Sequence, residues 1–199
     1  MHYKPRTVIL NNLEFDHADI FEDLNAIKKQ FHHLLRIVPG NGLIIAPVDD
    51  PNLVDVIEMG CWTPIEQFDV AGVEQPETDL WNTREVAADG SSFAIYWGDK
   101  HVGDVNWELM GMHNVHNALA AVAAARHAGV IAHEAVAALN EFKNVKRRME
   151  VRGVVNGITV YDDFAHHPTA INLTLDGLRN KVGRAKIIAL PEPPSNTKR

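Results

Sequence analysis

Four short segments of the sequence concentrate side chains that could do chemistry. Carboxylates, imidazoles, carboxamides and guanidinium groups dominate them, and such groups bind metal ions, heterocyclic rings and phosphates. Each segment also has an ordinary structural interpretation. The segments are NNLEFDHAD (11–19), GMHNVHNALAA (111–121), KNVKRRME (143–150) and VYDDFAHHPTAI (160–171).

The first segment follows a predicted strand, at the edge where open α/β sheets bind their ligands. Its side chains could hold a divalent cation or orient a substrate amine. Alternatively, an aspartate there caps a helix N-terminus, where negative charge is favourable. The side chains concerned are Glu14, Asp16, His17 and Asp19. Their spacing does not separate the two interpretations.

The second segment predicts a cluster of polar side chains on the first turn of a helix. Asn114 and Asn117 are three residues apart, and His113 and Asn117 are four apart, so they share one helical face. Two carboxamides and an imidazole suit a planar heterocycle, because amides pair with ring edges and an imidazole can stack. The alternative is an asparagine or histidine that caps an alanine-rich core helix.

The third and fourth segments have the same ambiguity. Arg148 and its basic neighbours could bind phosphate oxygens, although most such runs are solvated charges at a helix C-terminus.

In the fourth segment, Asp163 follows a predicted strand and could bind a ribose diol. His166 and His167 precede Pro168, which suits the first turn of a helix. They could bind zinc, but zinc sites usually gather three or four ligands, and no HExxH pattern is present.

The elements around these segments predict an α/β fold. Strands at 7–13, 42–47 and 64–70 alternate with helices at 21–38 and 51–60, which indicates a parallel sheet. Residues 81–109 alternate apolar and polar side chains, as antiparallel hairpins do. The remaining predictions are helices at 113–129 and 132–142, a hairpin at 149–163 turning at Asn156-Gly157, a helix at 167–183 and a strand at 185–194.

Composition narrows the class of protein. A chain of 199 residues with 46% hydrophobic and 23% charged residues can form one large or two small globular domains. The net charge of −7 argues against general affinity for nucleic acid or anionic membranes. Cys61 is the single cysteine, and no apolar run approaches the roughly 20 residues of a membrane span. We therefore expect a cytoplasmic protein with no signal peptide and no nucleic-acid or membrane partner.

Taken in order, NNLEFDH, GMHNVHNALAA, KRRMEVRG and DDFAHHPTAI resemble successive motifs of the Mur ligases, the ATP-dependent amide-forming enzymes of peptidoglycan synthesis. The resemblance covers essentially the whole chain. It implies the rear half of a parallel-sheet, P-loop-type ATPase central domain with an antiparallel hairpin region over 1–145. The start of a Rossmann-like C-terminal domain is implied over 146–199.

The resemblance also implies a role for individual residues. His17 matches a histidine that helps to hold Mg²⁺ beside the ATP γ-phosphate, so it is both a metal ligand and a catalytic candidate. Asn114 and Asn117 match the asparagines that contact adenine, with His113 beside them.

On the C-terminal side, Arg148 matches an arginine that faces the nucleotide across the domain joint. Asp163 matches an aspartate that reaches the ribose. His166 lies where the family lines the cleft near the phosphates, as the second catalytic candidate.

The form DDFAHHPTAI, preceded by KRRMEVRG and followed by EPPSNT, is most similar to the peptidoglycan-recycling branch of the family. That branch uses ATP and Mg²⁺ to join the murein tripeptide L-Ala-γ-D-Glu-meso-diaminopimelate to UDP-N-acetylmuramate through an acyl phosphate. A UDP-N-acetylmuramate–L-alanine ligase is the alternative within the family. Pro194 departs from the branch, which usually carries arginine there.

The chain contains no GxxxxGK[ST] phosphate-binding loop. We therefore expect a fragment that lacks an N-terminal part and much of the C-terminal domain, and that does not catalyse ligation alone. Two other classes compete with the ligase segment. One is a non-catalytic nucleotide-binding remnant, and the other is a metal-dependent hydrolase that uses His17, His166, His167 and the neighbouring carboxylates.

Overall fold

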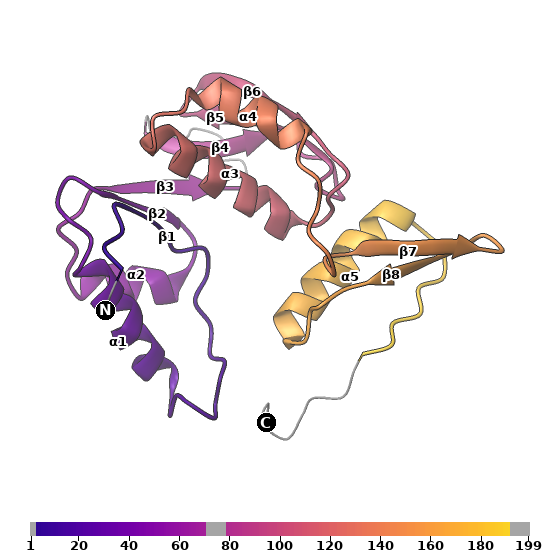
Figure 1. Cartoon of the computed structure of the whole chain (residues 1–199), viewed down its shortest axis with the longest axis horizontal. Helices are drawn as coiled ribbons and strands as arrows, with labels where there is room; N and C mark the ends of the chain where they lie inside the picture. The colour runs from indigo at the N-terminus through magenta and orange to yellow at the C-terminus, as the bar shows by residue number, and fades with distance from the viewer. Residues whose placement is uncertain (1–2, 71–78, 192–199) are drawn as a thin grey trace.

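The computed structural model describes residues 3–70 and 79–191, arranged in two sheets and five helices (Figure 1). The strands are β1 (Thr7–Ile9), β2 (Leu43–Pro47), β3 (Ile65–Asp69), β4 (Leu80–Arg84), β5 (Ser92–Trp97), β6 (Lys100–Asn106), β7 (Glu150–Val155) and β8 (Ile158–Asp162). The helices are α1 (Leu24–Leu35), α2 (Pro51–Glu58), α3 (Met112–His127), α4 (Ala132–Asn140) and α5 (Pro168–Val182).

The larger sheet has the order β1-β2-β3-β4-β5-β6. Strands β1 to β4 are parallel, and β5 and β6 continue the sheet as antiparallel hairpins. The predicted parallel sheet and the predicted hairpins are thus confirmed. Strand β4 belongs to both regions, because it pairs parallel with β3 and antiparallel with β5. The alternating pattern of residues 81–109 did not predict its parallel partner.

Helices cover both faces of the larger sheet, with α1 and α2 on one side and α3 and α4 on the other (Figure 1). Strand β2 is buried along its whole length, as expected for a strand covered on both faces. Ile44 and Ala46 pack with the helices α1 and α2, whereas Leu43 and Ile45 pack with α3. Successive side chains of β2 therefore pack alternately into two separate hydrophobic cores.

Helix α3 lies along the sheet in the opposite direction to the parallel strands. Its last residue, His127, has its Nδ1 2.7 Å from Thr7 Oγ1 at the start of β1. Its inward face is made of small and branched residues such as Ala118, Val122 and Ala123, which let it pack closely on the strands. The first turn of α3 therefore lies at the carboxyl edge of β1 to β3.

The hairpin β7–β8 and helix α5 form a separate group beside the start of α3 (Figure 1). Asn156 and Gly157 both have positive φ, 52° and 77°, as the predicted two-residue turn requires. The strand predicted at 185–194 is wrong over residues 185–191, which form no strand and leave Leu190 91% exposed. A strand needs a hydrogen-bonded neighbour, and β7 and β8 pair only with each other within the described residues. Residues 192–194 lie outside the described part.

None of the described helices is long and apolar enough to cross a membrane.

Candidate functional site

The larger of two adjoining cavities, about 930 Å³ in volume, lies between the sheet and the C-terminal group. The ends of β1 and β2 contribute Asn11, Asn12 and Asp49 to its wall. The first turns of α3 form a second wall, and the third is formed by residues that flank the hairpin β7–β8, such as Arg148 and Asp163, and by the start of α5. This is the carboxyl edge of the parallel strands, where the sequence predicted a ligand site.

The loop after β1 is held in place by the N-terminus of α2. Asp50 caps that helix by accepting hydrogen bonds from the backbone N–H of Asn52 (2.9 Å) and Leu53 (3.1 Å). Its second oxygen accepts from the backbone N–H of Leu13 (2.8 Å), and Asn52 Nδ2 donates to the Leu13 carbonyl (2.8 Å). The loop that carries Asn11 is therefore anchored through both the backbone N–H and the carbonyl of Leu13.

Carboxamides form a row on the wall made by α3 and the end of β1. Asn114 Nδ2 donates to the carbonyl of Met110 (2.8 Å), and Asn117 Nδ2 donates to Asn114 Oδ1 (3.4 Å). Asn11 Nδ2 donates to Asn117 Oδ1 over 2.7 Å. All four residues line the larger cavity. The contact between Asn114 and Asn117 agrees with their predicted common face, whereas the sequence did not single out Asn11.

Two imidazoles complete this wall. Burial lowers the pKa of His113, with Asp163 opposing and Arg148 reinforcing the shift, so the ring is neutral near pH 7. Burial also lowers the pKa of His116, whose ring meets Phe68 edge to face with centroids 5.8 Å apart. The sequence analysis did not assign His116 a role.

The C-terminal wall is built around Arg148 and Asp163. Asp163 accepts hydrogen bonds from the backbone N–H groups of Met149 (2.8 Å) and Ala165 (2.7 Å), one at each carboxylate oxygen. It thereby ties the start of β7 to the residues after β8. Arg147 and Met149 both have positive φ, 59° and 49°, so the chain turns sharply on either side of Arg148. Arg148 lines both cavities.

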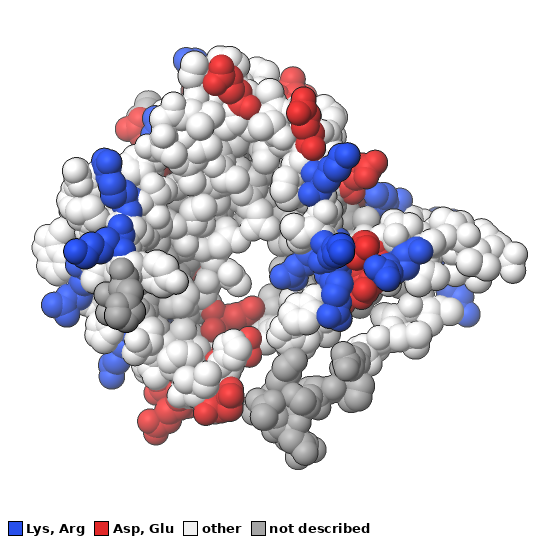
Figure 2. All heavy atoms as spheres, viewed as in Figure 1, with Lys and Arg blue, Asp and Glu red and all other residues white. Residues whose placement is uncertain are grey.

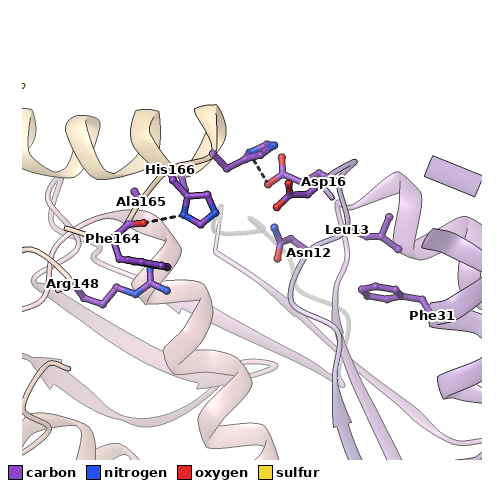
Figure 3. A pocket seen from close by; sticks show the side chains of 11 residues that line it. Asn12, Leu13, Asp16, Phe31, Arg148, Phe164, Ala165 and His166 are labelled. Atoms are coloured by element: carbon purple, nitrogen blue, oxygen red, sulfur yellow. Dashed lines mark hydrogen bonds and ion pairs between the residues drawn. The ribbon is translucent and has the colours of Figure 1, made fainter. Parts of the chain in front are cut away.

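The smaller cavity, about 340 Å³, has an acidic side chain on one wall and a basic side chain on the other (Figure 3). One wall carries Asn12 and Asp16 from the loop after β1, and the other carries Arg148, Phe164 and His166. The backbone N–H of His17 donates to Asp16 (2.7 Å) and lowers the pKa of that carboxyl group, so it is ionised at neutral pH. His166 Nδ1 lies 3.0 Å from the carbonyl oxygen of Phe164.

On the molecular surface, acidic and basic side chains gather on opposite sides of the opening between the two parts of the molecule (Figure 2). Glu14 crosses that opening: its Oε2 accepts from Thr169 Oγ1 (2.8 Å), and its Oε1 lies 3.4 Å from His167 Nδ1. Asn180 Nδ2 also donates to the carbonyl of Ala88 (2.8 Å). Polar contacts near both ends of α5 therefore join the C-terminal group to the rest of the described chain.

The structure brings most of the predicted residues together. His113, Asn114, Asn117, Arg148 and Asp163 all line the larger cavity, and His166 lines the smaller one beside Arg148. His17 lines neither cavity: it is exposed, with φ of 56°, and its Nε2 lies 3.9 Å from Asp16 Oδ2. The chemical roles of these seven residues stay predictions.

The zinc interpretation finds no support in this geometry. Within residues 3–70 and 79–191, no three histidine, cysteine, aspartate or glutamate side chains are arranged to hold a metal ion. His167 instead faces Glu14 and precedes the first turn of α5. The three histidines of the hydrolase hypothesis therefore do not form a common zinc site there.

Two family models match the chain, the Mur ligase middle domain over residues 1–125 and the Mur ligase glutamate ligase domain over residues 147–192. The chain belongs to the Mur ligase family. The UDP-N-acetylmuramate–L-alanyl-γ-D-glutamyl-meso-2,6-diaminoheptandioate ligase of Escherichia coli (strain K12) is 55% identical over 198 residues, which cover 99% of this chain. The UDP-N-acetylmuramate–L-alanine ligase of Caldanaerobacter subterraneus is 34% identical over 97% of it.

A solved Mur ligase structure has the same architecture. The murein peptide ligase Mpl of Psychrobacter arcticus 273-4 aligns over 100% of this chain with 46% sequence identity and a TM-score of 0.71. The chain spans 42% of the Escherichia coli protein and 40% of the Psychrobacter chain.

Proposed function

We propose that this chain supplies the adenine-nucleotide site of an ATP-dependent Mur ligase of peptidoglycan recycling. Its substrates would be UDP-N-acetylmuramate and the tripeptide L-Ala-γ-D-Glu-meso-diaminopimelate. The observation that carries the proposal is that Asn114, Asn117, Arg148 and Asp163, from distant motifs, line one cavity of about 930 Å³. The tripeptide is favoured over L-alanine because the relative named for the tripeptide is 55% identical, against 34%.

In this proposal the adenine base binds against the first turns of α3. Asn114 and Asn117 each use one N–H within the carboxamide row, so each keeps a second N–H for a ring nitrogen of the base. His113 is neutral because burial lowers its pKa, so it adds no charge beside an uncharged base. A partly apolar wall with a few fixed polar groups is typical of nucleotide-sized sites.

The ribose and phosphates would extend from the base toward the C-terminal wall. Each oxygen of Asp163 accepts one backbone hydrogen bond and keeps a further lone pair, so the carboxylate can still accept from ribose hydroxyl groups. The guanidinium of Arg148 has no hydrogen-bond or ion-pair partner among residues 3–70 and 79–191. A guanidinium between the two cavities suits the phosphate chain.

In this proposal Mg²⁺ binds on the Asp16 side of the smaller cavity and is coordinated partly by phosphate oxygens. Mg²⁺ usually takes one or two carboxylates together with phosphate oxygens and waters, so a full cage of protein ligands is not required. The ionised Asp16 lines this cavity, and the His17 side chain, which lines neither cavity, lies beside it with its Nε2 3.9 Å from Asp16 Oδ2. We propose that these two residues hold the ion, which when bound would neutralise phosphate charge.

The proposed reaction has two steps. An oxygen of the lactoyl carboxylate attacks the γ-phosphorus of ATP, which gives an acyl phosphate and releases ADP. The tripeptide amine then attacks the acyl carbonyl, and the tetrahedral intermediate expels inorganic phosphate as the nitrogen loses a proton. Residues of this chain would orient the nucleotide and stabilise phosphoryl charge through Arg148, with His166 beside the transferred group. Closure of the C-terminal group over the site would exclude water from the acyl phosphate.

We further propose a domain boundary near residue 146, and that the 199-residue chain does not catalyse ligation alone. The second proposal follows from the absence of a GxxxxGK[ST] segment in its sequence. Formation of the amide product from UDP-N-acetylmuramate, the tripeptide and ATP by the purified chain would refute it.

Calorimetric titration of the chain with adenosine tests the site itself. We expect measurable adenosine binding that weakens about tenfold or more in Asn117→Ala, because a base loses a fixed donor. Asn25→Ala, on the exposed surface of α1, is the matched control and should leave the affinity unchanged. Failure of the folded wild-type chain to bind adenosine, or equal effects of the two variants, would contradict the proposal.

A further inference from the structure

The row of carboxamides beside the larger cavity has a fixed direction. The carbonyl of Met110 can only accept, so Asn114 must turn its NH₂ group toward it and its oxygen toward Asn117. Asn117 must then donate to Asn114 and turn its own oxygen toward Asn11. The residue at position 11 must therefore be a donor, and the Nδ2 of Asn11 meets that requirement.

Asn11 leaves its own oxygen unpaired in this arrangement. Its Oδ1 is buried and has no hydrogen-bond partner among the described residues. Reversing the Asn11 carboxamide would place this oxygen against Asn117 Oδ1, which is 2.7 Å from the present donor. Only one orientation of Asn11 therefore keeps the hydrogen bond to Asn117, and it is the orientation that leaves Asn11 Oδ1 unpaired.

We propose that Asn11 is a positioning residue that, from the end of the row opposite Met110, holds the Asn117 carboxamide in the orientation that presents an N–H donor rather than an oxygen to the bound base. The inference rests on the proposed adenine site. Purine ring nitrogens are acceptors, and they match the remaining N–H groups of Asn114 and Asn117. A reversed Asn117 would present an oxygen, which repels a ring nitrogen.

Two substitutions of Asn11 separate this role from packing. Asn11→Asp keeps the shape but replaces the donor with a second acceptor opposite Asn117 Oδ1. The row then has acceptors at both ends, and no orientation of the two amides between them satisfies every contact. Asn11→Ala removes the donor but places no acceptor opposite Asn117 Oδ1, so Asn117 is then held only by its hydrogen bond to Asn114. We therefore expect Asn11→Asp to be the more damaging change.

The test is titration of the full 199-residue chain with adenosine and, separately, inosine. These nucleosides have opposite donor and acceptor patterns at purine positions 1 and 6. We expect Asn11→Asp to weaken adenosine binding about tenfold or more and Asn11→Ala about threefold. The ratio of inosine to adenosine dissociation constants should change in Asn11→Asp. Asn25→Asp, which adds the same charge at an exposed position of α1, should change neither quantity.

A measurement without ligand completes the test. Hydrogen exchange of the Asn117 side-chain amide, followed by NMR, should be slow in the wild type and faster in both Asn11 variants. Unchanged exchange, unchanged adenosine affinity in Asn11→Asp, or equal losses for adenosine and inosine would overturn the inference. If exchange follows the expected pattern but the wild type binds no adenosine, the proposed function fails and the orienting role of Asn11 stands.

Discussion

Gly177 of α5 packs directly on the backbone of Gly111, the residue that precedes α3. A Cβ atom at Gly177 would lie 2.8 Å from Gly111 Cα and 2.9 Å from Gly111 N. Gly111 has φ of 92°, and a Cβ there would lie 2.6 Å from the His113 ring. The C-terminal group and the first turn of α3 thus meet through two positions that exclude any side chain.

Gly177→Ala should push α5 away from α3 and widen the cavity between them. In a solvent-exposed helix this change stabilises by about 1 kcal/mol, because alanine has the higher helix propensity. Here the new methyl group meets backbone that cannot yield, and overpacking of this kind costs about 1–3 kcal/mol. We expect destabilisation in chemical denaturation and weaker adenosine binding by calorimetry.

Gly153→Ala is the matched control, because nothing lies within 4 Å of a Cβ at Gly153 in β7. It should leave both the stability and the adenosine affinity close to those of the wild type. A Gly177→Ala protein that is more stable than the wild type would show that α5 does not dock closely on α3 in solution.

Asp50→Ala should cost more stability than the loss of an ordinary helix cap. Removing a capping aspartate costs about 1 kcal/mol, and Asp50 also accepts from the backbone N–H of Leu13. Asp23→Ala is the matched control, since Asp23 caps α1 through Ala26 alone. Urea unfolding should give a larger loss for Asp50→Ala, by about 1 kcal/mol or more. Equal losses would mean that the Leu13 contact contributes nothing.

Much of the fold could be predicted because its signals are local. The apolar spacing around Ile27 and Leu35 indicates α1, and Asn156-Gly157 indicates the turn between β7 and β8. The position of the site was also predictable. Strand ends and the first turn of α3 carry its polar residues, and such ends meet at one edge of a parallel sheet.

The contacts between distant elements of the site could not be predicted from local sequence patterns. Asn11 and Asn117 are 106 positions apart, and either residue alone looks like an ordinary polar residue at an element end. The link from Asp50 to Leu13 and the packing of Gly177 on Gly111 likewise depend on how whole elements dock. The strand predicted at 185–194 failed for a related reason, because an apolar run becomes a strand only beside a partner.

The stability of the chain should fall as the pH drops below about 6.5. Burial lowers the pKa of His113 and His116 below the ordinary 6.5, so the unfolded chain binds more protons than the folded chain in that range. Their contribution to the free energy of unfolding is therefore present above about pH 6.5 and is lost as the pH falls through the lowered values.

His116→Gln removes one of these two titrating groups from both the folded and the unfolded chain. Urea unfolding between pH 7.5 and 5.5 should therefore show a shallower loss of stability in this variant than in the wild type. Identical slopes for the two proteins would contradict a lowered pKa at His116.

Arg148→Ala should weaken the binding of ATP and leave the binding of adenosine almost unchanged. Arg148 lines both cavities, and its guanidinium has no hydrogen-bond or ion-pair partner in the described part of the chain. It is therefore available to phosphate oxygens, and a charge-assisted hydrogen bond of this kind contributes about 1.5–3 kcal/mol. By calorimetry at low ionic strength, we expect the ATP dissociation constant to rise about tenfold or more and the adenosine constant to stay within about twofold.

Arg152→Ala is the matched control, because Arg152 is exposed on β7 and already pairs with Glu150 at 3.0 Å. It removes the same charge from the same strand region, so it separates a general electrostatic effect from a phosphate contact. If both variants weaken ATP binding equally, Arg148 acts through the general positive charge of this surface and not through a direct contact with the phosphates. Equal weakening of ATP and adenosine by Arg148→Ala would instead place the arginine beside the base, because only the phosphates distinguish the two ligands.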